Sequence, residues 1–128
     1  MSNAERHLVV LVVEDEPMVR FDAIQSFEDA GFEVVDADDA EQALVALEGR
    51  PDVDAVFTDV HMPGRMNGVE LAMLVHERRP DVQVLVTSGV MRLQKDDLPG
   101  GGCFIPKPYD ASQVAALIRD IVVGKSSG

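Results

Sequence analysis

The sequence contains one cysteine, one tyrosine and no tryptophan among its 128 residues. A single cysteine, Cys103, cannot form an internal disulfide, which favours a reducing compartment such as the cytoplasm. The longest uninterrupted apolar run is residues 8–13, far shorter than the roughly 20 residues that a membrane-spanning helix needs. The three histidines, His7, His61 and His76, share no ligand spacing with the cysteine, so we expect no zinc site.

Positive charge is also scarce, because 11 Lys and Arg residues face 23 Asp and Glu residues, which gives a net charge of −12. An acidic surface repels a phosphate backbone and aromatic rings for base stacking are few, so we expect no nucleic-acid partner. A phosphate substrate stays open, since a bound cation reverses the local sign. The glycines at 100–102 lack the following Lys-Ser or Lys-Thr of a phosphate-binding loop.

Short β-branched runs alternate with segments of helical spacing along the chain. The run LVVLVV at 8–13 is typical of a strand that is buried on both faces. Pro17 fits the first turn of a helix that Gly31 ends. The inward residues of that helix are predicted to be Met18, Phe21, Ile24 and Phe27. Further strands are predicted at 34–35, 54–58, 82–87 and 103–105, and further helices at 39–48, 68–78, within 91–97, and at 110–123.

This alternation predicts an α/β fold with a five-stranded parallel sheet and helices on both faces, because each parallel crossover requires a helix. We expect one domain at 8–123, with an N-terminal tail or cloning remnant at 1–7 and a C-terminal tail at 124–128. In open sheets of this kind, functional sites lie at the carboxyl ends of the strands. The residues that end the strands are therefore the candidates for chemistry.

Acidic, hydroxyl and basic residues end four of the predicted strands. Glu14 and Asp15 follow the first, Asp59 the third, Ser88 the fourth and Lys107 the fifth. Carboxylates that converge at one edge repel unless a cation relieves them, and few hard oxygen ligands suit Mg²⁺. A carboxylate, a metal, a lysine and a hydroxyl are the parts that phosphoryl transfer needs.

Each of these residues also has an ordinary structural interpretation. Asp15 precedes Pro17 and fits a helix cap, which does not exclude a metal-binding role. The stretch 87–89 taken alone is a turn, and Lys107 taken alone is a surface lysine. Their joint placement favours the phosphoryl-transfer interpretation.

The motifs VVEDEP (12–17), TDVHMPG (58–64) with a later Gly68, VTSG (86–89) and FIPKPY (104–109) together resemble the receiver domain of bacterial two-component response regulators. The resemblance implies a flavodoxin-like fold of the CheY type with strand order 2-1-3-4-5. It also implies a phosphorylated signalling protein of the bacterial cytoplasm. The protein would assist its own phosphorylation and dephosphorylation without being an enzyme that releases a product.

The resemblance implies a role for each acidic residue of the site. Asp59 is the phosphoacceptor, which takes the phosphoryl group from a sensor histidine kinase or a phosphotransfer protein. The cofactor is Mg²⁺, held by Asp15 and Asp59 and by the backbone carbonyl of His61, with Glu14 as an indirect or secondary ligand. The segment between Asp59 and Gly68 is one residue longer than the commonest family spacing.

The remaining site residues are implied to act as the switch. Lys107 pairs with Asp59 and then with the phosphoryl oxygens, and a cis bond between Lys107 and Pro108 aims it at the site. Ser88 is the hydroxyl that closes onto the phosphoryl group, with Thr87 as the second candidate. Phe104 is the aromatic side chain that turns inward when this happens.

The implied partners are the kinase or phosphotransfer protein and a downstream protein target that the sequence does not name. No membrane partner is expected. The chain is expected to be a monomer or a weak dimer through the face of 91–97, 103–105 and 110–123, which corresponds to the 4-5-5 face of the family.

Two alternatives belong to other functional classes. The first is a small Mg²⁺-dependent phosphatase with an aspartate nucleophile, but such enzymes place two aspartates after the first strand, where this chain has Glu14-Asp15-Glu16. Sustained turnover of a chromogenic phosphate ester would favour it. The second is a receiver-like interaction module without phosphorylation, which the full set of Asp15, Asp59, Ser88 and Lys107 disfavours.

Overall fold

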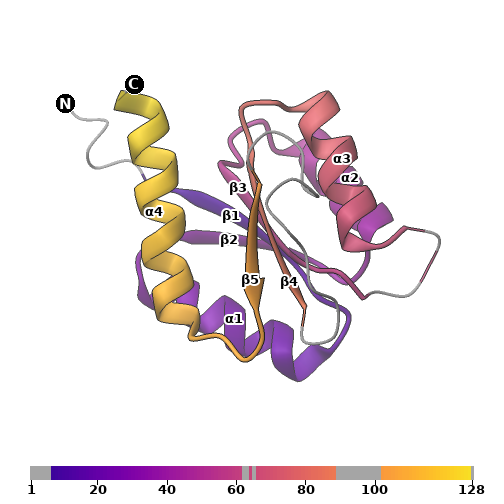
Figure 1. Ribbon diagram of the computed structural model, residues 1–128, viewed down its shortest axis with the longest axis horizontal. Helices are drawn as coiled ribbons and strands as arrows, with labels where there is room; N and C mark the ends of the chain where they lie inside the picture. Colours follow the sequence, from indigo (N-terminus) through magenta and orange to yellow (C-terminus); the bar gives the residue numbers. More distant parts are fainter. Residues whose placement is uncertain (1–6, 62–63, 65, 89–101, 128) are drawn as a thin grey trace.

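The computed structural model describes residues 7–61, 64, 66–88 and 102–127, and the short helix expected within 91–97 lies outside these residues (Figure 1). Strands and helices of the described part follow one another as the sequence predicts, and strand bounds differ from the predicted ones by one to two residues. The last helix, predicted to end at 123, continues to Ser127. The elements are β1 (Val9–Val13), α1 (Pro17–Asp29), β2 (Glu33–Ala37), α2 (Ala40–Gly49), β3 (Ala55–Asp59), α3 (Gly68–Arg78), β4 (Gln83–Ser88), β5 (Cys103–Pro106) and α4 (Ala111–Ser127).

The five strands form one parallel sheet, as the sequence predicts, in the order β2-β1-β3-β4-β5 that the resemblance implies. Every residue of β1 and β3 is buried, which explains their continuous apolar runs. The register places Asp59 beside Thr87 of β4 and Thr58 beside Val13 of β1. The carboxyl ends of the central strands therefore meet at one edge of the sheet.

Helices cover both faces of the sheet (Figure 1). On one face, α2 and α3 pack on a core that includes Leu11, Val56 and Val86. On the other face, α1 and α4 pack on a core that includes Val12, Phe57 and Leu85. Neighbouring residues along each strand thus point to opposite cores, which fixes the face of every side chain at the sheet edge.

The predicted inward face of α1 is only partly right. Phe27 is buried and packs with Ala23, but Met18 is 70% exposed and Phe21 is 57% exposed. An α-helix turns about 100° per residue, so Met18 lies on the opposite side of the helix from Phe27. The exposed pair Met18 and Phe21 and the buried pair Ala23 and Phe27 both have helical spacing. The side of α1 that packs on the sheet is the one with the small Ala23.

The helix starts differ in how they are capped. Asp39 caps α2 by accepting a hydrogen bond from the Gln42 backbone N–H at 2.8 Å, and Asn67 and Glu70 form a capping box at the start of α3. The interpretation of Asp15 as a helix cap is wrong, because the N-cap of α1 is Glu16, which makes no side-chain cap hydrogen bond. None of the helices in the described ranges has the length and apolar content that crossing a membrane requires.

Candidate functional site

Asp59, the last residue of β3, lies at the centre of the sheet edge and is only 6% exposed. Its Oδ1 accepts a hydrogen bond from the His61 backbone N–H at 3.0 Å, and its Oδ2 accepts one from Lys107 Nζ at 2.5 Å. A buried charge is costly unless it is paired and hydrogen-bonded, and both carboxylate oxygens of Asp59 have such partners. His61 itself is exposed, so its backbone and not its imidazole contacts the acid.

Lys107 follows β5 directly and reaches across β4 to Asp59. Its backbone N–H donates to the Ser88 carbonyl at 3.1 Å, which extends the β4–β5 pairing as far as the lysine. The Lys107–Pro108 peptide bond is cis, as the resemblance implies. The strand pairing and the following turn thus fix where the ammonium group lies.

Glu14 and Asp15 follow β1, the strand that pairs with β3. Glu14 is buried, and its Oε2 accepts a hydrogen bond from the Glu16 backbone N–H at 3.0 Å. Burial raises the pKa of the Glu14 carboxyl from 4.5 to about 6, and the negative charges of Asp59 and Asp15 add to the rise. Asp15 is exposed. Asp15 and Asp59 therefore lie close enough to Glu14 for their negative charges to affect its pKa.

The donor set fits a hard divalent cation that keeps several waters. In the part of the chain that the structure describes, no three His, Cys, Asp or Glu residues form a metal-ligand group by themselves. Mg²⁺ does not need such a group, because one or two carboxylates and a carbonyl oxygen suffice when waters complete the octahedron. Burial first, and then the negative charges of Asp59 and Asp15, raise the pKa of Glu14, and such a cation would oppose this rise.

The predicted switch residues lie on β4 and β5. Ser88 is buried at the end of β4, and Phe104 is half-buried and packs on the α2–α3 core. Phe104 is paired with Val86, so alternation places Ser88 on the same face of the sheet as Phe104. Thr87 points to the opposite face, the face of Asp59 and Phe57, and its buried Oγ1 has no hydrogen-bond partner among the described atoms.

Tyr109 closes the site on the α1–α4 face. Its ring meets Phe57 edge-to-face with 5.3 Å between ring centroids. Burial, together with the negative charges of Glu14 and Asp59, raises the pKa of the Tyr109 hydroxyl to about 12. The hydroxyl is therefore neutral at physiological pH and adds no charge to the acidic site.

Two residues with a structural part in the site went unassigned in the sequence interpretation. Gly68, quoted only as part of a motif, begins α3 directly against the backbone of Asp59, where an added Cβ would lie 2.1 Å from the Asp59 carbonyl oxygen. Arg20 in α1 donates from Nη1 to the Glu14 carbonyl oxygen at 2.8 Å. Gly68 can be identified in the sequence because it follows the TDVHMPG motif. Nothing in the sequence distinguishes Arg20 from other helix arginines.

Comparisons with known proteins agree with this geometry. The family model described as "Response regulator receiver domain" matches residues 10–119. Over 88% of its length, the chain is 31% identical to the sensor kinase CckA of Brucella abortus, of which it spans 12%. It is 27% identical to the response regulator receiver protein CpdR of the same organism, with 89% of the chain and 96% of CpdR covered.

A solved structure of the receiver domain from the hybrid histidine kinase CckA superposes with a TM-score of 0.76 at 30% identity, covering 89% of this chain and 98% of that one. The family match spans most of the chain, and the sheet order and the Asp59–Lys107 pair agree with it. The chain therefore belongs to the receiver-domain family of two-component response regulators, whose members are phosphorylation-dependent signalling switches.

Proposed function

We propose that Asp59 accepts a phosphoryl group from a phosphohistidine on a sensor histidine kinase or a phosphotransfer protein. A carboxylate oxygen of Asp59 attacks phosphorus, the P–N bond breaks with its electrons returning to the imidazole nitrogen, and an acyl phosphate forms. The observation that carries this proposal is the 2.5 Å contact between Lys107 Nζ and Asp59 Oδ2 at the sheet edge. This contact places an ammonium group beside the oxygens that would receive the phosphoryl group.

Receiver domains in general bind Mg²⁺ at this acidic site. For this chain we assign Asp15, Asp59 and the His61 backbone carbonyl as ligands, with Glu14 acting indirectly. Bound Mg²⁺ supplies the positive charge that lets a phosphoryl group approach an acidic site. The His61 backbone supports the assignment. Its N–H donates to the Asp59 carboxylate, which keeps the backbone carbonyl of His61 near the acid.

The switch follows from the charge that phosphorylation adds. The new group carries up to two negative charges and three acceptor oxygens, which Lys107 and the Ser88 hydroxyl move to meet. Ser88 and Phe104 share one face of the sheet, so movement of Ser88 toward Asp59 makes room for Phe104 to turn inward. The response is a population shift between two states that one covalent charge biases.

The altered surface is the face of β5 and α4, where a groove of about 290 Å³ is lined by residues that include Ile105, Tyr109 and Leu117. This groove adjoins Lys107 through Pro106 and Pro108. A downstream protein, or weakly a second copy of the chain, binds this face in one of the two states. Residues 8–123 form the unit that carries the switch.

The experiment that tests the acceptor is labelling with acetyl phosphate and Mg²⁺, followed by intact-mass measurement. The wild-type chain should gain one phosphoryl group, and Asp59→Asn should gain none. Asp81→Asn is the matched control, because Asp81 is an exposed aspartate whose side chain is 74% accessible, and this variant should be labelled like wild type. Labelling that survives in Asp59→Asn shows that Asp59 is not the sole acceptor.

Lys107→Ala separates metal binding from switching. This variant should still bind Mg²⁺, because no lysine ligates the metal, but its conformational response to phosphorylation should be impaired. The response is measured by the change in backbone amide NMR signals of β4 and β5 between the free and labelled forms. An unchanged response contradicts the role that we assign to Lys107.

A further inference from the structure

The backbone of Glu14 is held at both of its polar atoms. Its N–H donates to the Ala37 carbonyl of β2 at 3.1 Å, which prolongs the β1–β2 pairing by one residue. Its carbonyl oxygen accepts a hydrogen bond from Arg20 Nη1 at 2.8 Å. The second contact lies outside the sheet, because Arg20 belongs to α1 and reaches back over the turn between β1 and the helix.

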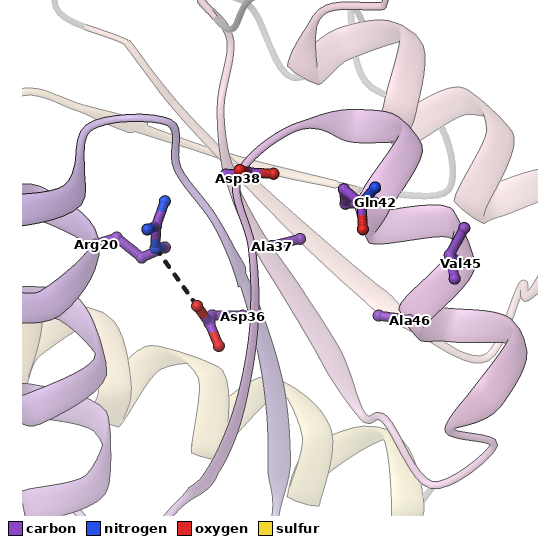
Figure 2. Close-up of a pocket in the computed structure, with 7 residues that line it drawn as sticks. All are labelled: Arg20, Asp36, Ala37, Asp38, Gln42, Val45 and Ala46. Atoms are coloured by element: carbon purple, nitrogen blue, oxygen red, sulfur yellow. Dashed lines mark ion pairs between the residues drawn. The ribbon is translucent and has the colours of Figure 1, made fainter.

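Arg20 is itself held by the edge strand. Its Nε lies 3.4 Å from Asp36 Oδ2 in β2, with 22% of the arginine side chain and 52% of the aspartate side chain exposed. Arg20 and Asp36 line a cavity of about 290 Å³. Figure 2 shows their ion pair on one side of this cavity and Gln42 and Val45 of α2 on the other. The planar guanidinium group thus joins α1, the end of β1 and the end of β2.

The bond to the Glu14 carbonyl bears on Asp15. The Glu14 carbonyl and the Asp15 N–H belong to one planar peptide unit, so fixing the carbonyl fixes the direction in which the chain enters Asp15. This restraint matters because Asp15 directly follows a second acid, and β1 pairs with β3, which ends in Asp59, so like charges at one sheet edge oppose an ordered turn. The N-cap Glu16 makes no side-chain cap hydrogen bond, so Arg20 shares the hold on this turn with the bond from the Glu16 N–H to Glu14 Oε2 at 3.0 Å.

We propose that Arg20, oriented by Asp36, is a positioning residue for Asp15 in the Mg²⁺ site. This inference rests on the proposed function, since it presupposes that Asp15 ligates the metal. Arg20 does not touch the metal. It holds the peptide unit from which the Asp15 carboxylate extends, as outer partners hold the ligands of other metal sites.

The charge of Arg20 and its proposed positioning role predict opposite changes in Mg²⁺ affinity when Arg20 is replaced. Removal of a cation near an acidic site makes the site more negative, so electrostatics alone predicts tighter Mg²⁺ binding in Arg20→Gln. Loss of positioning predicts weaker binding, because part of the binding free energy is then spent on ordering the turn. The direction of the change therefore identifies the mechanism.

The experiment is calorimetric titration of Mg²⁺ into the metal-free chain at fixed ionic strength. We expect Arg20→Gln to raise the Kd about 10-fold, the lower end of the effect seen for outer partners of metal ligands. Arg50→Gln is the matched control, because it removes the same charge and an ion pair with Glu33 of β2 without contacting Glu14. It should bind Mg²⁺ like wild type.

Arg20→Lys keeps the charge and cannot make both contacts of the guanidinium group, so its Kd should lie between those of wild type and Arg20→Gln. Thermal unfolding in EDTA shows whether Arg20→Gln folds. If it does not fold, Arg20→Lys replaces it in the Mg²⁺ titration. If the wild-type chain binds Mg²⁺ and both Arg20 variants bind it equally well or more tightly, the positioning role of Arg20 is wrong, but the proposed function stands. A wild-type chain that binds no Mg²⁺ overturns the metal assignment of the proposed function first.

Discussion

Replacement of Gly68 by alanine perturbs the contact on which the geometry of Asp59 depends. Gly68 is the first residue of α3, and its N–H donates to the Val60 carbonyl at 2.9 Å. An alanine Cβ at this position would lie 2.1 Å from the Asp59 carbonyl oxygen, 2.8 Å from the Asp59 carbonyl carbon and 2.9 Å from Val60 Cα. All three atoms belong to the backbone, so no side-chain rotation relieves the overlap.

The magnitude follows from these distances. To bring the Cβ to even 3.0 Å, α3 and the Asp59 backbone must separate by about 0.9 Å, the shortfall from 2.1 Å. Overpacking of this kind costs about 1–3 kcal/mol. The gain in helix propensity from glycine to alanine is at most about 1 kcal/mol. Because the overlap is with backbone atoms, the cost should lie at the upper end of that range, so we expect a net loss of about 2 kcal/mol in the free energy of unfolding.

The same displacement should affect phosphorylation more than stability. Asp59 would shift by a sizeable fraction of an ångström relative to Lys107 Nζ, which now lies 2.5 Å from Oδ2. Misplacement of a reacting group by about 1 Å can cost about 100-fold in rate. We expect the rate of labelling by acetyl phosphate to fall by between about 10-fold and this limit.

Urea unfolding measures the stability of Gly68→Ala, and intact mass against time measures its labelling rate. Gly49→Ala is the control, because Gly49 ends α2 and no atom lies within 4 Å of an added Cβ. This control should be as stable as wild type or slightly more stable, and it should be labelled at the wild-type rate. A Gly68→Ala variant that unfolds and is labelled like Gly49→Ala refutes the reasoning.

Two further predictions concern buried polar groups of the site. Thr87→Val removes a buried hydroxyl that has no partner among the described atoms, so urea unfolding should show a gain of about 1 kcal/mol; a loss would mean that a partner holds this hydroxyl. Glu14 binds its proton more tightly in the folded state, with a pKa of about 6 against 4.5. In EDTA, the stability of wild type relative to Glu14→Gln should therefore fall by about 2 kcal/mol in all as pH rises from below 4.5 to above 6, and a flat difference contradicts the raised pKa.

The sheet and the central pair of the site are predictable because they depend on local rules. Parallel strands buried on both faces must be apolar throughout, so the polar residue that ends each run marks the edge of the sheet. This rule alone locates Asp59 and Lys107, and the contact between them confirms their convergence. The adjacency of the first and third strands needed the family resemblance in addition, because periodicity does not order strands.

The features that the sequence does not predict depend on choices between equivalent patterns. Met18 and Phe21 are three residues apart and the buried Ala23 and Phe27 are four apart, and either spacing places two residues on one side of a helix. Only the packing of Ala23 against the sheet decides which side of α1 faces inward. Arg20 resembles any helix arginine until the fold brings it to the Glu14 carbonyl. Asp15 is the plausible cap in sequence, but the N-cap of α1 is Glu16, which makes no side-chain cap hydrogen bond.

The residues that violate ordinary folding rules gather at one edge of the sheet. Glu14 is a buried acid with a raised pKa, Thr87 is a buried hydroxyl without a described partner, and Gly68 tolerates no side chain. Away from this edge the described chain obeys the rules, as the capping box of α3 and the uniformly apolar β1 illustrate. A sequence that folds well elsewhere has no structural reason to retain such costs in one place. A cation would offset the negative charge around Glu14, and an acceptor oxygen of a phosphoryl group could pair with a hydroxyl at this edge, so these two costs fit a site that binds both groups.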